Sequence, residues 1–431
     1  MLENQNNMLD KRIIEQVLYE QYQEISGNAD EYLCPRREEE QIDMESSMAQ
    51  VVLGVRRSGK STMCYNVLKQ QGEKFAYVNF DDERLDGMQS SEFNLIMEVL
   101  YKIYGDFRYL FLDEIQNVEG WHLFVNRLLR QKMHVLVTGS NARLLGGELA
   151  THLTGRYEPT ELFPFSFQEY CMYKGVNTVV HTTKEEAFLR AAFDEYLHQG
   201  GFPELMKKKN KTRYINTLVE NILKRDIEQR YRIRYEEAFE RLSHHLLNVA
   251  PVIVATNSLA EQFGLGSHHT ADKYIGFLEQ AYLLLGVRRY SPKSRQRIRE
   301  EKVYPVDVAL MDGRADAFVG ENLGWRLESV VYLELLRRNR PIGRDIYYFR
   351  NNDGYEADFI VCKGNKAEEI YQVCYDISKE KTRKRELRGL FAASKDTGCN
   401  NLCLITDHER ETVESDGSLV KILPAYEWLC I

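Results

Sequence analysis

Short runs of nearly continuous apolar residues recur through the first 140 positions, and each run ends in polar residues. Four of these runs span 49–54, 74–80, 109–114 and 134–140. Runs of this kind are typical of strands that are buried on both faces of a parallel sheet. Apolar residues at helical spacing occupy the gaps, at 62–71, 93–104 and 121–132. Strands that alternate with helices predict an α/β fold, in which helices cover both faces of a parallel sheet.

The pattern changes in the second half of the chain. Helical spacing dominates 214–247, and 256–290 reads as a helix, a glycine turn, a second helix and a strand. This order is typical of a winged helix. Beyond it, a helix, further strands and an amphipathic helix at 382–395 predict another α/β domain. We therefore predict four parts: an N-terminal helical extension (1–44), an α/β domain (45–205), a helical and winged-helix domain (206–310) and a C-terminal α/β domain (311–431).

Composition narrows the class of protein. The 431 residues are 43% hydrophobic and 28% charged, as in ordinary soluble proteins. The formal net charge of −8 means that a nucleic-acid site would need a local basic patch. The eight cysteines form no CxxC pair, which predicts reduced thiols rather than disulfides or a zinc site. Neither a signal peptide nor a run of 18 apolar residues occurs, so we expect a cytoplasmic protein without a membrane partner.

The first apolar run leads directly into GVRRSGKST, which fits the phosphate-binding loop pattern. A strand, a glycine loop and a helix form the context in which this pattern binds a nucleotide. Lys60 would reach the β and γ phosphates, and the Ser61 hydroxyl would ligate Mg²⁺. The predicted nucleotide-binding residues of this loop are Gly54, Val55, Arg56, Arg57, Ser58, Gly59, Lys60, Ser61 and Thr62.

Two later strands end in residues that suit nucleotide hydrolysis. YLFLDE ends in Asp113, a predicted second Mg²⁺ ligand, and Glu114, which would polarise the attacking water. HVLVTGS and the residue after it supply Thr138, Ser140 and Asn141, and a polar side chain here would contact the γ-phosphate or the water. No guanine-specific NKxD signature is present, which favours ATP over GTP.

The stretch SPKSRQRIREEK lies between the expected wing strands and is strongly basic. Its cations are Lys293, Arg295, Arg297 and Arg299. A basic wing beside a second helix would suit phosphate contacts on double-stranded DNA. The alternative is a solvated loop on a winged helix that contacts proteins.

Together with GVRRSGKST and YLFLDEIQNVEGW, the stretches VLVTGSNARLL, LTGRYEPTELFPFSFQEY and GGFPEL occur in this order. The chain thereby resembles prokaryotic AAA-domain P-loop ATPases that carry a C-terminal domain of unknown function with a restriction-endonuclease-like core. The resemblance implies that Asp113 and Glu114 form the Walker B pair. It also implies that Arg156 is a catalytic arginine finger, acting on its own or a neighbouring site. The alternative is an arginine that pairs with Glu158 or Glu161.

The C-terminal part contains acidic residues in an order similar to that of a nuclease metal site. A helix bearing Glu328 and Glu334 precedes two strands, with Asp358 on the first and Gln372 on the second. Acidic residues and a lysine in such an order hold metal and activate water in restriction endonucleases. The acidic-x-Lys pattern is replaced here by Gln372-Val373-Cys374, so we expect cleavage activity to be lost.

The sequence thus predicts an ATP-hydrolysing enzyme that acts as a switch or motor and uses ATP and Mg²⁺. Double-stranded DNA and an unidentified protein are the candidate partners, and oligomerisation is compatible with the motifs. Two alternatives stay open: an ATP-gated nuclease, and a slow-hydrolysing ATP-binding signalling protein with a protein partner.

Overall fold

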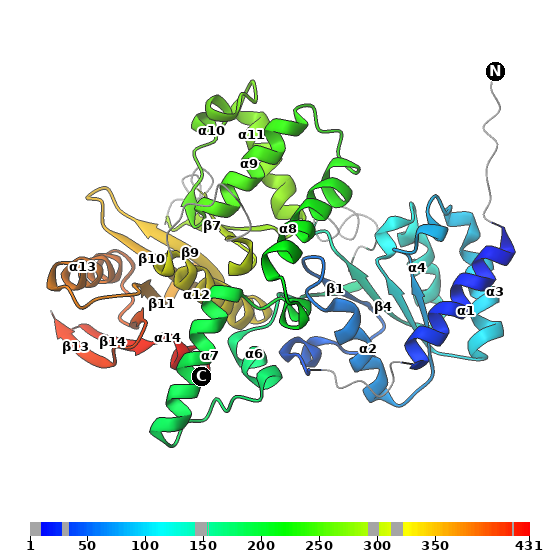
Figure 1. Ribbon diagram of the computed structural model, residues 1–431, viewed down its shortest axis with the longest axis horizontal. Helices are drawn as coiled ribbons and strands as arrows, with labels where there is room; N and C mark the ends of the chain where they lie inside the picture. Colours follow the sequence, from blue (N-terminus) through cyan, green and yellow to red (C-terminus); the bar gives the residue numbers. More distant parts are fainter. Residues whose placement is uncertain are drawn as a thin grey trace. The chain divides into compact units, whose positions relative to one another are not determined.

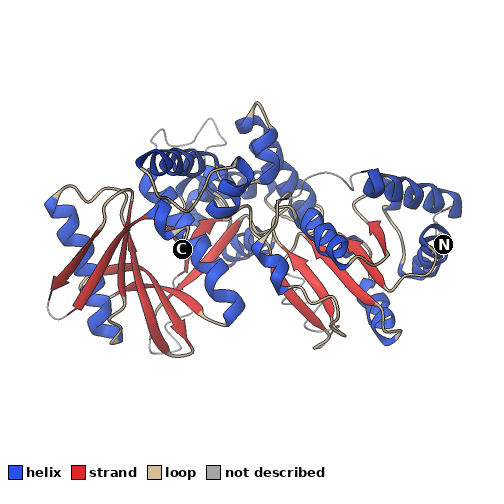
Figure 2. Cartoon of the chain, turned by 90° about the horizontal axis from the view of Figure 1, so that it is seen from below, coloured by secondary structure: helices blue, strands red, loops and turns tan. Residues whose placement is uncertain are grey.

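The computed structural model describes residues 10–27, 34–142, 153, 155–291, 301–311, 322–415 and 418–431. By its internal contacts the chain separates into two compact units, residues 1–162 and 163–431. Both strands and helices are present in each unit (Figure 2). The finer four-part division that the sequence indicates stays a prediction.

The first unit is built on a five-stranded parallel sheet with the strand order β2-β3-β4-β1-β5. Its strands are β1 (Ala49–Leu53), β2 (Phe75–Asn79), β3 (Tyr109–Asp113), β4 (His134–Gly139) and β5 (Tyr157–Glu161). Its helices are α1 (Lys11–Gly27), α2 (Lys60–Gln71), α3 (Phe93–Tyr104) and α4 (Trp121–Arg130), with short 3-10 helices at Arg37–Gln41, Glu83–Leu85, Ser90–Glu92 and Ile115–Asn117. The four strands and three helices predicted from periodicity are therefore confirmed to within two residues at either end. Helix α1 packs beside α3, as Figure 1 shows in blue and cyan.

Apolar continuity explains why this sheet is buried. Every residue of β1 and β3 is buried, as expected of parallel strands covered on both faces. Because parallel strands all end at the same edge of the sheet, the polar residues that follow β1, β3 and β4 are brought together there.

The second unit contains a nine-stranded mixed sheet with the order β13-β14-β12-β11-β10-β9-β7-β8-β6. Its strands are β6 (Val252–Ile253), β7 (Leu284–Arg289), β8 (Glu301–Pro305), β9 (Asp345–Arg350), β10 (Glu356–Lys363), β11 (Lys366–Val373), β12 (Leu402–Thr406), β13 (Glu411–Ser415) and β14 (Ser418–Pro424). Its α-helices are α6 (Phe167–Lys174), α7 (Thr183–Gln199), α8 (Lys211–Asn221), α9 (Glu236–Val249), α10 (Thr256–Phe263), α11 (His268–Gln280), α12 (Leu323–Asn339), α13 (Glu380–Thr397) and α14 (Ala425–Trp428). Shorter helical turns lie at Pro203–Lys207, Val308–Met311 and Arg340–Ile342, and a π-helix at Ile222–Glu228 continues α8.

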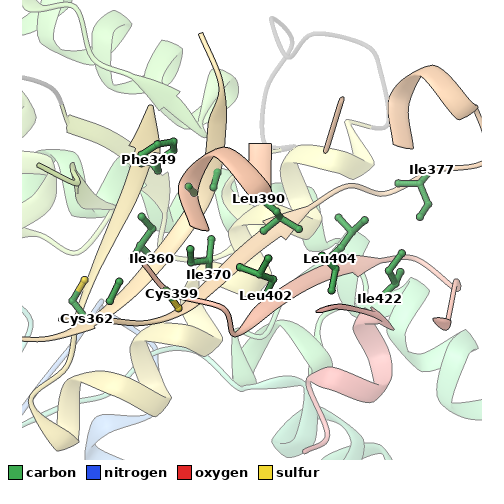
Figure 3. Packing of buried hydrophobic residues seen from close by; sticks show 14 residues of the cluster. Phe349, Ile360, Cys362, Ile370, Ile377, Leu390, Cys399, Leu402, Leu404 and Ile422 are labelled. Atoms are coloured by element: carbon green, nitrogen blue, oxygen red, sulfur yellow. The ribbon is translucent and has the colours of Figure 1, made fainter. Parts of the chain in front are cut away.

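The core of this unit differs from the predicted order in one respect. The helix with Glu328 is followed by three antiparallel strands rather than two, and Asp358 lies on the second, β10. Only a short turn separates β9 from β10, so the sequence pattern indicates a single strand where the structure has two. Helix α13 covers β10 and β11 and closes an apolar cluster that includes Ile360, Ile370 and Leu390 (Figure 3).

The predicted helix–turn–helix segment is helical in two pieces. Helices α10 and α11 pack together, and the antiparallel pair β7–β8 follows, with β6 added to β8. Lys293, Arg295, Arg297 and Arg299 lie outside the described residues. Within the described residues, none of the helices is both long enough and apolar enough to cross a membrane.

Candidate functional site

The glycine loop between β1 and α2 has the backbone shape that a phosphate cradle needs. Gly54 and Gly59 adopt φ values of 155° and 97°. A side chain at Gly54 would place its Cβ 2.0 Å from the carbonyl oxygen of Leu162, so only glycine fits. The Oγ of Ser58 is buried and has no hydrogen-bond partner among the described residues. A buried hydroxyl inside the loop is therefore free to donate to a phosphate oxygen.

Lys60 is the first residue of α2, and its side chain is buried. Its ammonium nitrogen donates to the carbonyl oxygens of Gly54 and Val55 at 3.1 and 3.3 Å. The same nitrogen lies 3.4 Å from a carboxylate oxygen of Glu114. The chain thus holds a compact cation between the loop and the acidic end of β3, where phosphates of a nucleotide would compete for it.

Asp113 connects the loop to the neighbouring strands. Ser61 Oγ donates to Asp113 Oδ1 at 3.0 Å, and Tyr77 from β2 donates to Oδ2 at 3.3 Å. Thr138 from β4 also donates to Oδ1. Burial, aided by the charge of Glu114, raises the pKa of Asp113 to about 6, although the hydroxyl donors and Lys60 oppose this rise.

Glu114 stands at the turn that follows β3 and has a left-handed backbone, with φ 52° and ψ 40°. For a residue with a side chain this conformation costs about 1–2 kcal/mol. Its N–H donates to Thr138 Oγ1 at 2.9 Å, and Gln116 donates to its carboxylate at 2.5 Å. Burial alone would raise the pKa of Glu114, but Lys60 and the Gln116 hydrogen bond outweigh burial and lower it. The carboxylate is therefore kept ionised, as a group that polarises water must be.

The other loop residues predicted to bind the nucleotide have different surroundings. Arg56 forms a two-pronged ion pair with Asp81, which follows β2, at 2.9 and 3.3 Å. Arg57 has a left-handed φ of 69°, and Thr62 is exposed on the first turn of α2. Buried Arg36, which sequence reasoning did not single out, donates to the carbonyl oxygen of Ser58 at 3.0 Å.

Beyond β4, Ser140 and Asn141 are both buried, and a hydrogen bond from Ser140 helps to lower the pKa of Glu114. Arg156 is exposed, and it forms no ion pair with any residue that the structure describes. Its backbone carbonyl instead accepts a hydrogen bond from the N–H of Ala49 at the start of β1. The alternative, in which Arg156 pairs with Glu158 or Glu161, is therefore not among the described contacts.

The side chains at the loop suit a Mg²⁺ ion. The Ser61 hydroxyl and the Asp113 carboxylate are hard oxygen donors within 3.0 Å of each other. Among the described residues no group of three or more His, Cys, Asp or Glu side chains could hold a metal ion. A Mg²⁺ ion here would therefore take its remaining ligands from phosphate oxygens and water, as this ion usually does in nucleotide sites.

The predicted nuclease-like residues form a second polar cluster, in the nine-stranded sheet. Glu328 from α12 and Asp358 from β10 flank the ammonium of Lys302 on β8, at 2.5 and 3.7 Å. Tyr304 donates to the same Glu328 oxygen at 2.6 Å, and the N–H of Val373 donates to Asp358 at 2.8 Å. Burial alone would lower the pKa of Lys302, but the two carboxylates outweigh burial and raise it.

The side-chain amide of Gln372 connects Asp358 to helix α13. Its amide nitrogen donates to Glu386 on α13 at 2.7 Å, and its amide oxygen accepts the N–H of Asp358 at 3.3 Å. Glu334 lies apart from this cluster, paired with Arg337 and Arg338 one turn further along α12. Lys302, from a strand that is not adjacent to β10 in the sheet, thus brings a positive charge to the two carboxyl groups.

Sequence reasoning missed several contributors to these sites, among them Arg36, Gln116, Lys302, and Thr138 and Tyr77 as partners of Asp113. Only Gln116 carried a local signal, because it lies two residues beyond Glu114. The others come from strands or segments whose neighbourhood depends on the sheet order.

Comparison with known proteins agrees with this geometry. Residues 46–171 match the AAA domain family, and two domains of unknown function match residues 190–316 (DUF8612) and 323–428 (DUF4143). An uncharacterized protein of Methanocaldococcus jannaschii, MJ1544, is 31% identical over 90% of this chain and 89% of its own length. An uncharacterized protein of Haemophilus influenzae is 29% identical over 89% of this chain and 95% of its own.

Among solved structures, the Thermotoga maritima RuvB Holliday junction branch migration motor matches 65% of this chain and 94% of its own, at 15% identity and a TM-score of 0.29. A TM-score this low carries no weight for function. The parallel sheet, the phosphate loop and the family match make residues 46–171 an AAA-type P-loop ATPase domain. The chain therefore belongs to the family of AAA-domain proteins that includes the M. jannaschii protein.

Proposed function

We propose that this protein is an ATP-hydrolysing switch or motor that uses Mg²⁺ and couples the state of its nucleotide to a winged helix that contacts double-stranded DNA. The observation that carries the hydrolytic part is the contact between Lys60 and Glu114, with Asp113 held beside them by Ser61 and Thr138. A cation, a water-polarising carboxylate and a metal-binding carboxylate are the parts that phosphoryl transfer requires.

In this mechanism each side chain has one task. The Lys60 ammonium neutralises charge on the β and γ phosphates, and Glu114 orients and polarises the attacking water. Ser61 and Asp113 would hold the Mg²⁺, which supplies charge neutralisation at the phosphates when bound. As the phosphates draw Lys60 toward them, its pairing with Glu114 weakens, and the carboxylate gains freedom to accept a hydrogen bond from water. Ser140 donates a hydrogen bond to this carboxylate, and Ser140 and Asn141 are placed to contact the γ-phosphate or the attacking water.

Arg156 supplies positive charge to the transition state, at the nucleotide site of its own subunit or of a neighbour. Its exposure and its lack of a described ion-pair partner support this role. Mixing Arg156→Ala subunits with Glu114→Gln subunits tests it. If the finger acts between subunits, the mixture recovers turnover that neither variant has alone; absence of recovery limits the finger to its own subunit.

The direct test of hydrolysis is phosphate release by wild type, Lys60→Ala and Glu114→Gln. General acid–base groups contribute about 10²–10⁴-fold to a rate, so Glu114→Gln should bind ATP normally and lose at least 10²-fold in turnover. Equal background release by all three proteins would contradict the proposal.

DNA contact rests on the fold of the described residues 252–291 and 301–305. Helices α10 and α11 followed by the pair β7–β8 have the order of a winged helix, and the segment between those strands is basic in sequence. We expect fluorescence anisotropy to detect duplex binding that weakens steeply with salt. Neutralising Arg295, Arg297 and Arg299 with glutamine should reduce the affinity and the slope of its salt dependence. An unchanged slope would favour a winged helix that contacts a protein.

A further inference from the structure

A cavity of about 320 Å³ opens in the second unit beside the beginning of α11. It is formed by α11, by the turn that joins α10 to α11, and by the segment 232–235 that precedes α9. Its volume falls at the lower end of the range found for pockets that bind small organic molecules. The cavity is remote in sequence from the phosphate loop. The residues that line it have no role in the function proposed above, although those on α11 belong to the proposed winged helix.

The charged side chains that line this cavity are all positive. Three cations line it, Arg232, Arg234 and Lys273, and its lining contains no carboxylate. All three are exposed, and none forms an ion pair with any residue that the structure describes. In a chain whose net charge is −8, three uncompensated cations around one hollow create a local attraction for an anion.

The wall behind these cations is aromatic. Tyr235, Tyr274 and Phe277 line it, and the last two are buried. The Lys273 ammonium lies 5.5 Å from the centre of the Phe277 ring, and the Arg234 guanidinium lies 5.2 Å from that of Tyr235. The cations are thereby held beside aromatic surface rather than directed away from the cavity. A matching ligand would combine an anionic group with a flat apolar body.

We infer that this cavity binds a nucleoside phosphate, as a second nucleotide site separate from the phosphate loop. The phosphate accepts hydrogen bonds from Arg232, Arg234 and Lys273, and the ring of the nucleoside packs against the aromatic wall. Inorganic phosphate satisfies only the cations and leaves that wall in water. A duplex presents its phosphates on a convex backbone with its bases stacked inside, so it offers no ring to the hollow.

Binding of the fluorescent nucleotide mant-ADP tests this inference in full-length protein. The starting variant is Lys60→Ala, in which the phosphate loop is disabled. Adding Arg232→Gln and Lys273→Gln should weaken the remaining mant-ADP binding at least tenfold. The matched control adds Lys209→Gln and Arg241→Gln, which remove two exposed cations of the same unit that do not line the cavity. This control should bind mant-ADP as the starting variant does.

A neutral variant separates a defined cavity from simple charge attraction. Thr270 lines the cavity. The Ser267 side chain caps α11 by accepting a hydrogen bond from the backbone N–H of Thr270, and this N–H is retained in Thr270→Leu. The leucine fills part of the hollow without changing its charge, so it should also weaken mant-ADP binding at least tenfold. Unlabelled ADP should displace the label at concentrations at which inorganic phosphate does not.

Three results would overturn the inference. The pocket variants could bind mant-ADP as tightly as the control does. Thr270→Leu could leave binding unchanged, which would reduce the site to surface charge. Duplex DNA could displace the label more effectively than ADP, which would assign the cations to the DNA backbone. Because the readout measures binding without hydrolysis, in a protein whose phosphate loop is already disabled by Lys60→Ala, its failure is distinguishable from failure of the proposed ATPase function.

Discussion

Thr138 on β4 donates a hydrogen bond to Asp113 on β3 and accepts one from the N–H of Glu114. A single buried hydroxyl therefore fixes both acidic residues of the nucleotide site, one through its carboxylate and the other through its backbone. The second contact also stabilises the left-handed backbone at Glu114, which directs its carboxylate toward Lys60. The neighbouring strand thus sets the geometry of the acidic pair before any nucleotide enters.

We expect Thr138→Val to lower ATP turnover about tenfold or more while the fold is kept. Valine has the shape of threonine but leaves the Glu114 N–H without a partner, which costs about 1–3 kcal/mol in buried surroundings. Phosphate release measures the rate. The control is Thr160→Val, which changes a buried threonine on β5 outside the acidic pair. Equal losses in the two variants would show that Thr138 contributes only to packing.

The sequence was sufficient for the parts of the fold that local pattern determines. The strands that flank the phosphate loop, and the polar residues at their ends, could be predicted because buried parallel strands carry a strong apolar signal. Sheet order could not be predicted, since β1 lies between β4 and β5 rather than beside β2. The Thr138–Asp113 contact, and the meeting of Lys302 with Glu328 and Asp358, depend on that kind of long-range pairing. Arg36 was missed because its hydrogen bond to the Ser58 carbonyl joins segments that are not neighbours in the sequence.

Lys302→Met should destabilise the second unit by about 3–5 kcal/mol. Removing the cation leaves the Glu328 carboxylate, which is only slightly exposed and lies in the same cluster as Asp358, without its cationic partner, and an uncompensated buried charge has a cost of this size. Burial and the charge of Glu328 already raise the pKa of Asp358, so loss of Lys302 raises this pKa further. Urea unfolding at neutral pH measures the loss of stability.

A second substitution identifies the cause of this loss. In the double variant Lys302→Met, Glu328→Gln, the negative charge of Glu328 is gone, and much of the lost stability should return. A double variant as unstable as Lys302→Met alone would mean that the aliphatic stem of the lysine, rather than its charge, carries the effect.

The stability of the second unit should fall as pH rises. Burial and the nearby Glu301 carboxylate, opposed by Arg288, raise the pKa of Glu279 on α11 to about 8 from an ordinary value near 4.5. The folded state then holds a proton that the unfolded chain has already released, so stability decreases between these two pH values. Each unit of pKa shift corresponds to about 1.4 kcal/mol of unfolding free energy, and the partial exposure of Glu279 reduces the total effect.

Glu279→Gln should remove this dependence. Because the amide stays neutral, the variant should be more stable than wild type by on the order of 1–2 kcal/mol at pH 8.5 and nearly equal to it at pH 5.5. Thermal melting at both pH values measures the difference. Glu261→Gln, at an exposed position on α10, serves as the control and should follow wild type. A Glu279→Gln curve parallel to that of wild type would show that this carboxylate does not titrate as described.

Gly201→Ala should impair folding of the second unit, because the backbone of another segment occupies the space of a side chain there. A Cβ at Gly201 would lie 2.2 Å from the carbonyl oxygen of Phe165, and the two residues are joined by the hydrogen bond from Phe165 N–H to Gly201 O at 2.8 Å. The N–H of Gly201 also donates to buried Asp307 at 2.8 Å, so a shift of this backbone disturbs two contacts. We expect a loss of about 2 kcal/mol or more, in the range of steric overpacking.

Gly276→Ala is the matched control, since α11 leaves open space at that position and alanine is the better helix former. Urea unfolding should therefore show Gly276→Ala at or above wild-type stability, and a Gly201→Ala protein of equal stability would mean that the segments separate without cost.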